Sequence, residues 1–330
     1  MSITAVVPVW NGRDLLERLL GSLEAQTEPA SEVLVVDNGS EDGAPEMARQ
    51  RGARVIPMGR NAGFAAAVNR GIRESRGEWI AVLNSDVELA ADYFAVLTAT
   101  DGWFATGKIL SSAGGTVCAT IDGSFDALCR GGTAWRVGSG RADGPEFQAR
   151  RKITSPPWTA VLFRAELFRR VGLLEESFES YLEDVDFGLR CAALELTGLY
   201  VPTAVAWHRG SATLGRWHPD TVRRISRNQL LLLARHYPSR LLLRCGWPIA
   251  VAQILWGAVA LRHGAGLPWL RGKWEGLRNF SAARKKPGSF DPGLLQLLRA
   301  NEETIRSVQV ATGFDRYWSL YFKLTGGGVK

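Results

Sequence analysis

Asp86 follows the apolar run EWIAVLN of residues 78–84, which is typical of a strand buried on both faces. An aspartate at the mouth of a sheet can hold Mg²⁺ or Mn²⁺ against a diphosphate, because these ions prefer oxygen ligands and keep substrate phosphates in their shell. An Asx turn that caps a following helix is the simpler role for Asp86. The carboxylates of Glu88 and of Asp37, in the loop DNGSEDG, favour a metal or nucleotide site.

A second acidic cluster, Glu183, Asp184 and Asp186, stands at the start of a predicted helix in SYLEDVDFGLRC. The helix dipole favours anions in the first turn, but one acid is enough to cap a helix. Repulsion among neighbouring carboxylates favours a proton on one of them, as a general base near neutral pH requires. The cluster therefore contains a candidate base.

His208 closes the apolar run LYVPTAVAWH, which predicts a strand. A lone histidine is more often a packed or solvated residue than a metal ligand. Because His208 stands at a strand end, on the same rim as the carboxylates, metal ligation competes evenly with the structural role.

The elements that must position these residues alternate between strands and helices, a pattern typical of an α/β fold with a mostly parallel sheet. Strands are predicted over residues 3–9, 32–37, 54–57 and 78–84, and helices over residues 15–23, 44–52 and 62–77. Open α/β sheets bind ligands beyond the carboxyl ends of their strands. Asn11, Asp37 and Asn84 to Asp86 stand at such ends, so we expect the pocket at the first, second and fourth strands.

The rest of the chain has three kinds of pattern. Residues 101–157 are rich in glycine and are predicted to be long surface loops. A strand over residues 159–164, two helices that end at Gly172 and Gly198, and a last strand over residues 199–208 follow. From Thr221 the chain is predicted to be helical, with breaks at Pro238, Pro248, Pro268 and Pro287.

Six motifs in order give the chain a family resemblance: VVPVWN, LVVDNGSEDG, RNAGFAAAVNRGI, LNSDVEL, YLEDVDFGLR and VAWHRG. With them, roughly residues 3–235 resemble the inverting glycosyltransferases of GT-A family 2, and among them the rhamnosyltransferase-like bacterial members. The resemblance implies a GT-A fold, which is Rossmann-like, with a mostly parallel central sheet flanked by helices. From its own residues we expect the C-terminal helical region to associate with a membrane.

The resemblance also implies roles for single residues. The family's contacts to the donor nucleotide fall on Pro8, Asp37, Asn61, Asn84 and Asp86. The first two belong to the base pocket, and the two asparagines to the sugar and phosphates. Asp86 shares a Mg²⁺ or Mn²⁺ ion with His208, and Asp184 is the catalytic base. Apart from the resemblance, Trp158, just before the strand over residues 159–164, is a candidate for stacking on an acceptor sugar, with a core or rim aromatic as the alternative. Glu183 is a second candidate for contact with the acceptor.

Two departures from the family pattern refine this picture. Asn84 replaces the first aspartate of the family's DxD metal motif, which predicts a modest metal affinity. Processive synthases of the family carry QxxRW and several membrane helices, whereas this chain has Thr213, Arg216 and Trp217 in TLGRW and no convincing span. Processive synthesis is therefore not expected.

The implied reaction moves a sugar from a nucleotide diphosphate to a hydroxyl of a polyprenyl-diphosphate-linked saccharide, in cell-surface polysaccharide synthesis. The favoured donor is dTDP-L-rhamnose, with UDP- and GDP-sugars as alternatives. Residues 1–220 form the catalytic domain, with a nucleotide-sugar half over residues 1–100 and an acceptor half over residues 101–220; residues 221–330 form the helical region. Transfer to a soluble or protein acceptor, and a non-catalytic sugar-nucleotide-binding protein, are the alternatives.

Charge is distributed unevenly along the chain. Up to Arg209 there are 21 basic and 27 acidic residues, and thereafter 19 basic and 6 acidic, a net charge of +13. This predicts attraction to an anionic surface, and Leu-rich runs bordered by arginine favour a lipid interface over nucleic acid. A helical layer packed on the catalytic domain or on a second copy of the chain is the alternative.

Composition and cysteine content limit the class of protein and its cellular location. Apolar residues make up 46% and charged residues 22%, which excludes collagen-like and wholly disordered chains. The four cysteines form no CxxC pair, and the first residues lack a signal-peptide pattern. The 17 uncharged residues from Cys245 to Leu261 fall short of a span. We expect a cytoplasmic protein, peripheral on the inner face of the cell membrane.

Overall fold

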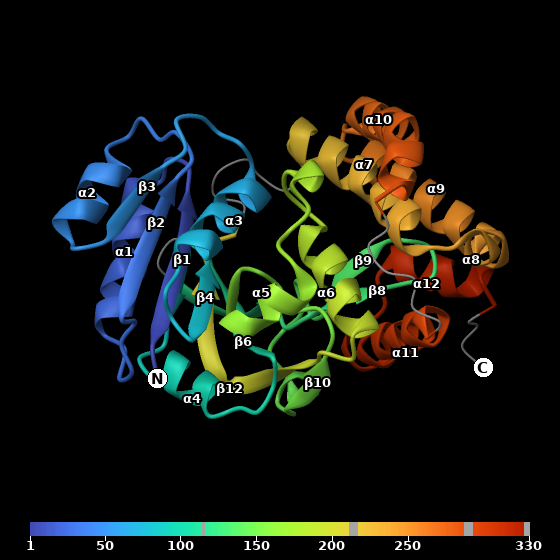
Figure 1. The fold of residues 1–330 in the computed structure, drawn as a ribbon. Helices are drawn as coiled ribbons and strands as arrows, with labels where there is room; N and C mark the ends of the chain where they lie inside the picture. The colour runs from blue at the N-terminus through green and yellow to red at the C-terminus, as the bar shows by residue number, and fades with distance from the viewer. Residues whose placement is uncertain (114–115, 211–216, 287–292, 327–330) are drawn as a thin grey trace. The chain divides into compact units, whose positions relative to one another are not determined.

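A computed structural model describes residues 1–113, 116–210, 217–286 and 293–326 (Figure 1). The chain forms two compact units. The first contains Met1–Phe125 and Gly138–Thr213, and the second contains Asp126–Val137 and Leu214–Lys330. The segment Asp126–Val137 thus belongs to the second unit, although it lies inside the range that the sequence assigns to the catalytic domain.

The first unit begins with alternating strands and helices. They are β1 (Ile3–Val9), α1 (Arg13–Glu24), β2 (Glu32–Asp37), α2 (Ala44–Gln50), β3 (Arg54–Pro57), α3 (Phe64–Glu74) and β4 (Trp79–Leu83). β1 pairs in parallel with β2 and β4, and β2 with β3. These elements and parallel pairs confirm the predicted βαβ pattern. The pattern could be predicted because the buried strands are continuous apolar runs.

The remaining elements of the first unit complete the sheet. They are β5 (Val87–Leu89), α4 (Tyr93–Thr98), β6 (Phe104–Ala113), β7 (Thr116–Gly123), η1 (Pro145–Phe147), β10 (Arg151–Ile153), β11 (Ala160–Arg164), α5 (Ala165–Val171), η2 (Glu176–Phe178), α6 (Glu183–Ala193) and β12 (Gly198–His208). The prediction of long loops over residues 101–157 is wrong for β6 and β7. The glycines are part of the reason: a Cβ at Gly107, inside β6, would overlap the carbonyl oxygen of Ala204.

The sheet is mixed, which corrects the expectation of a mostly parallel one. In the described part of the chain its strand order is β10-β12-β6-β11-β4-β1-β2-β3, with β5 beside β12 and β7 beside β6. β11 lies between β4 and β6 and runs antiparallel to both. β12 runs parallel to β6, so His208 and the end of β6 lie at the same edge.

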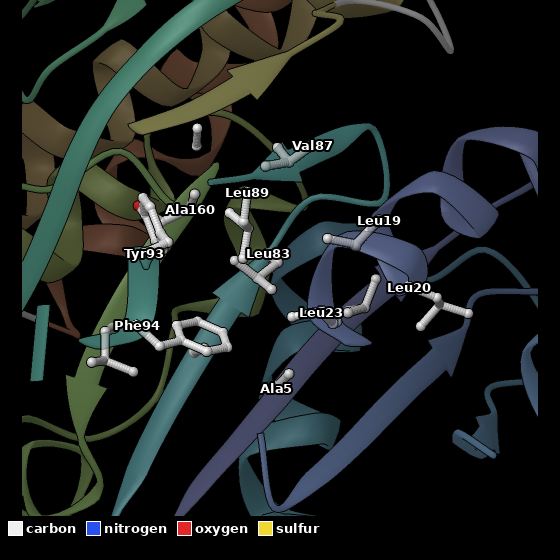
Figure 2. Close-up of a cluster of buried hydrophobic side chains, with 14 of the residues drawn as sticks. Ala5, Leu19, Leu20, Leu23, Leu83, Val87, Leu89, Tyr93, Phe94 and Ala160 are labelled. Carbon is white, nitrogen blue, oxygen red and sulfur yellow. The ribbon is translucent and has the colours of Figure 1, made fainter. Parts of the chain in front are cut away.

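The core of the first unit lies between this sheet and its covering helices. Leu16, Leu19, Leu20 and Leu23 repeat at helical spacing along α1 and are all buried. Figure 2 shows three of them together with buried side chains of β1, β4 and β5. The apolar face of α1 therefore fixes the ends of these strands, where the polar residues stand.

The second unit is mainly helical. Its elements are the hairpin β8 (Asp126–Leu128) and β9 (Ala134–Arg136), then α7 (Pro219–His236), α8 (Ser239–Arg244), α9 (Gly246–Arg262), α10 (Gly266–Arg284), α11 (Leu294–Thr312) and α12 (Arg316–Leu324). Among the described residues, no helix is long and apolar enough to cross a membrane.

The predicted helix breaks near Pro248 and Pro268 are confirmed, but each lies a few residues earlier, at Cys245 and at residues 263–265. Both prolines lie in the first turn of the helix that follows, where proline is tolerated. Pro238 does separate α7 from α8, and Pro287 lies outside the described residues. The leucine run of α7, together with Arg227 and Arg235, is mostly buried, so α7 is a core helix and not an interfacial one.

Candidate active site

Asp86 and His208 meet because two strands pair. β5 runs antiparallel to β12 with Val87 opposite His208, which brings the preceding residue, Asp86, beside the histidine ring. The distance from His208 Nε2 to Asp86 Oδ1 is 3.1 Å. The backbone N–H of Arg209 also donates to the carbonyl oxygen of Asp86, at 3.1 Å. Both side chains are largely buried, so this corner of the sheet is well defined.

Asp122 is a third member of this cluster and was not predicted from the sequence. Its Oδ2 lies 2.9 Å from His208 Nδ1. In the antiparallel pair of β6 and β7, Ile109 is opposite Gly123 and Leu110 is opposite Ile121, so Asp122 is the extra residue of a β-bulge. Bulges re-aim side chains and are frequent beside active sites. Because the sequence suggested a loop here, no strand pattern marked Asp122.

The two carboxylates determine the charge of the His208 ring. Burial by itself lowers its pKa, but hydrogen bonds to Asp122 and Asp86 outweigh burial and raise the pKa to about 9. Without a metal ion, the ring is therefore an imidazolium held between two carboxylates at neutral pH. A metal ion at Nε2 has to displace that proton.

The cluster fits a divalent ion with few protein ligands. One carboxylate oxygen and one ring nitrogen face each other, whereas Asp122 binds the other ring nitrogen and so orients the histidine, as carboxylates commonly do behind metal-ligating histidines. No group of three or more His, Cys, Asp or Glu side chains that could hold a metal ion occurs in the described ranges. The remaining ligands must come from substrate phosphates and water, which suits Mg²⁺ or Mn²⁺.

The structure brings the expected nucleotide residues to the ends of β1 and β2. Pro8 is opposite Val36 in the parallel pair, and Asp37, at the end of β2, accepts a hydrogen bond from the backbone N–H of Ser40 at 2.8 Å. Asn38 links this edge to the exposed Asn61, because its side-chain N–H donates to Asn61 Oδ1 at 3.1 Å. The loops after β2 and β3 are thus joined by side chains.

Asn84 belongs to a neighbouring strand end. It follows β4, and its backbone N–H donates to the carbonyl oxygen of Thr159 at 2.9 Å. An open hollow of about 560 Å³ lies along the same rim, lined by Gly12, Arg13, Asp14, Leu15, Asp42 and Arg209. Leu15 and Arg209 also line a small cavity with Asp86. Space for a ligand therefore adjoins the carboxylate cluster.

The acidic residues at the start of α6 have different roles. Asp186 is fully buried and pairs with Arg190 at 3.0 Å, and Arg190 also donates to the carbonyl oxygens of Val171 and Leu173. This ion pair holds α6 in place, and Asp186 has a structural role in it. Asp184 is buried and accepts a hydrogen bond from the N–H of Val185 at 2.8 Å, and Glu183 is buried beside it.

The loop before α6 has a strained backbone. Glu179, Tyr181 and Leu182 have φ angles of 60°, 73° and 68°, in the left-handed region that non-glycine residues rarely adopt. The loop is tied to the start of α3, because the N–H of Ala65 donates to the carbonyl oxygen of Glu179 at 3.0 Å. Such strain concentrates at functional sites.

Trp158 does not line an open site. It is 2% exposed and packs among Phe163, Phe168 and Phe187, with ring centroids 4.7 to 6.3 Å away. Trp158 is therefore a core aromatic, which was the alternative in the sequence analysis. In TLGRW, Thr213 and Arg216 lie outside the described residues.

Comparisons with known proteins relate this chain to glycosyltransferases. The family model described as "Glycosyl transferase family 2" matches residues 4–100. The N-acetylglucosaminyl-diphospho-decaprenol L-rhamnosyltransferase of Mycobacterium tuberculosis is 33% identical over 227 residues, which cover 61% of this chain and 74% of that protein. Glycosyltransferase AglE of Haloferax volcanii is 37% identical over 91 residues, covering 26% of this chain and 30% of AglE.

Two solved structures resemble the whole chain. GalNAc-T7 with UDP, GalNAc and Mn²⁺ has a TM-score of 0.62 at 12% identity, covering 99% of this chain and 57% of that one. The mannosyltransferase PcManGT from Pyrobaculum calidifontis, in complex with GDP-Man and Mn²⁺, has a TM-score of 0.51 at 17% identity, covering 99% and 88%. At these identities the likeness concerns the fold alone.

Proposed function

Because this chain belongs to glycosyltransferase family 2 and is a glycosyltransferase, we propose that it transfers a sugar with inversion from a nucleoside diphosphate to a hydroxyl of a polyprenyl-diphosphate-linked saccharide. The observation that carries the proposal is the cluster of Asp86, His208 and Asp122 at the strand ends, in the same unit as the buried Asp184. The name of the 33% identical relative supports a lipid-linked acceptor and L-rhamnose as the sugar. The donor that we propose is dTDP-L-rhamnose.

The donor binds along the strand ends. Pro8 and Asp37 hold the base, and Asn61 and Asn84 contact the nucleotide sugar and phosphates. Asp86 and His208 would hold Mg²⁺ or Mn²⁺, and Asp122, which contacts Nδ1, would orient the ring of His208 for this role. When bound, the ion supplies positive charge that stabilises the diphosphate as it leaves.

The acceptor is activated by Asp184. Its carboxylate takes the proton of the acceptor hydroxyl while the oxygen attacks the anomeric carbon from the face opposite the diphosphate. The new C–O bond forms as the bond to the diphosphate breaks, and the electron pair leaves with the nucleoside diphosphate. A single displacement inverts the anomeric configuration. Glu183, beside the base, contacts the acceptor.

The lipid-linked acceptor requires the enzyme to work at a membrane. We place the protein on the inner face of the cell membrane as a peripheral protein, with the basic second unit as the attachment. The net charge of +13 after Arg209 supports this location.

Replacement of the base is the sharpest test of this function. Asp184→Asn should bind the donor nearly as well as the wild type but transfer it about 10² to 10⁴ times more slowly, the usual cost of losing a general base. Donor binding is measured by calorimetry and transfer by product analysis, which also reports the anomeric configuration.

Asp186→Asn is the matched control, because it removes a buried ion-pair partner and should mainly lower thermal stability. Near-normal turnover of Asp184→Asn would remove Asp184 from the mechanism. Donor binding by the wild type without transfer to any acceptor would instead favour a non-catalytic sugar-nucleotide-binding protein.

A further inference from the structure

Helix α9 is apolar on both its buried and its exposed faces. Val251, Ala252 and Ala260 face the interior. Trp247, Ile254 and Leu261, spaced seven residues apart, form one row on the opposite side and are 62 to 70% exposed. A solvent-facing helix surface normally carries polar side chains, so this apolar row is a candidate docking surface.

Helix α10 carries a second exposed row. Leu267, Trp274 and Leu277 repeat at helical spacing and are 56 to 77% exposed. The other side of α10 packs closely against α7, where Gly272 meets the backbone of Arg223. The exposed row is therefore not needed to hold the helix in the unit.

Arginines accompany both rows. Arg240, Arg244, Arg262, Arg271 and Arg278 are exposed on α8, α9 and α10. Arg278 lies over the ring of Trp274, with 4.4 Å from its guanidinium carbon to the ring centroid.

Glu275 is the sole acidic residue of segment 239–284, and it forms ion pairs with two arginines. It pairs with Arg223 at 2.7 Å and with Arg271 at 3.3 Å. The charge that accompanies the apolar rows is therefore entirely positive within this segment.

We propose that these two rows, which we call the α9–α10 face, dock the protein on a bilayer that contains anionic lipids. The inference rests on the proposed function, which needs a lipid-linked acceptor, and names the surface that reaches it. Apolar side chains, tryptophan and arginine on helices that do not span a bilayer are the chemistry of an interfacial anchor. A second copy fits less well, because pairing the same face with itself would bring arginines together without acids to neutralise them.

Flotation of the full-length protein with vesicles tests the docking. The wild type should float with vesicles containing phosphatidylglycerol and remain largely unbound with pure phosphatidylcholine. The double variants Leu267→Ser/Leu277→Ser and Arg262→Glu/Arg278→Glu should each float at least tenfold less. Val310→Ser and Arg299→Glu, which change exposed residues of the same types on α11, are the matched controls and should float like the wild type.

Each result has a definite meaning. Equal recovery of the wild type in the soluble fraction with both lipids, or equal losses in the α11 controls, would overturn the proposal. Dimers in sedimentation velocity that the face variants abolish, together with absent flotation, would assign the face to a second copy. Transfer to a short-chain acceptor in detergent should be unchanged in the face variants; failure of the wild type in that assay would contradict the proposed function without affecting the docking result.

Discussion

At the scale of single residues, His208 is the best-defined group of the site, because both of its ring nitrogens have a carboxylate partner. Asp86 was predicted from the strand end that precedes it, and His208 from the end of its own strand. Asp122 could not be predicted, since its position depends on an extra residue in β7 and not on a motif.

Replacement of Asp122 tests this arrangement. Asp122→Asn removes the negative charge beside Nδ1 and should lower the Mn²⁺ affinity about 10- to 100-fold, the usual effect of losing the partner behind a metal-ligating histidine. Mn²⁺ binding is measured by electron paramagnetic resonance, without any turnover. Asp101→Asn, at an exposed aspartate, is the control. Unchanged Mn²⁺ affinity in Asp122→Asn would show that Asp122 does not orient the ligand.

The ion pairs of His208 make the unfolding free energy of the metal-free protein depend on pH. The pKa of His208 is raised from 6.5 to about 9, so its ion pairs contribute fully to stability below pH 6.5, and this contribution is lost as pH rises through about 9. Asp122→Asn should therefore lose less unfolding free energy than the wild type between pH 6.5 and 9. Denaturant titrations at several pH values measure the difference, and identical pH profiles would contradict the assignment.

At the scale of elements, the sequence predicted the apolar strands and missed the polar ones. β1, β2 and β4 are continuous apolar runs, whereas β6 and β7 are rich in glycine, serine and threonine and are stabilised by pairing within the sheet. β11 was predicted as a strand over residues 159–164, but its antiparallel direction could not be predicted, because strand direction depends on neighbours distant in sequence. The leucine and arginine residues of α7 predicted a lipid-facing helix, and this prediction was wrong because most of these side chains are buried.

The close contact of α7 and α10 gives a prediction for the second unit. Gly272→Ala places a methyl group where the carbonyl oxygen of Arg223 lies and should destabilise the protein by about 1 to 3 kcal/mol, as overpacking does. Gly246→Ala, at the open start of α9, has no neighbour within 4 Å and should be neutral or slightly stabilising. Thermal unfolding compares the two. Equal stability of both variants would mean that the helices separate easily.

At the scale of the whole molecule, the second unit is assembled from two distant parts of the chain. Arg130 of the hairpin pairs with Glu302 of α11 at 2.7 Å, and the hydroxyl of Tyr237 donates to the carbonyl oxygen of Cys129. Asn301 also donates to the carbonyl oxygen of Leu128. These contacts fix the hairpin within its unit, and no local pattern in residues 126–137 indicates them.

Removal of the helices should therefore expose the hairpin. In a chain that ends at Asp220, residues 126–137 should lose their protection against hydrogen exchange, because Tyr237, directly after α7, and the partners on α11 are missing. Strands β1, β2 and β4 should stay protected, since their core lies within the first unit. Mass spectrometry of peptides measures both regions. Unchanged protection of residues 126–137 would show that the hairpin folds without the helices.

The pairing of Arg130 with Glu302 also has a consequence for synthesis on the ribosome. The two residues are separated by 172 positions, so at 5 to 20 residues per second Arg130 waits roughly 10 to 35 s for its partner. For about the second half of that interval, all strands and helices of the first unit, which ends at Thr213, are already synthesised and available to fold while the hairpin is still open. The order of translation thus lets the sheet form first, and it leaves residues 126–137 as the stretch of the nascent chain that a chaperone has the longest time to bind.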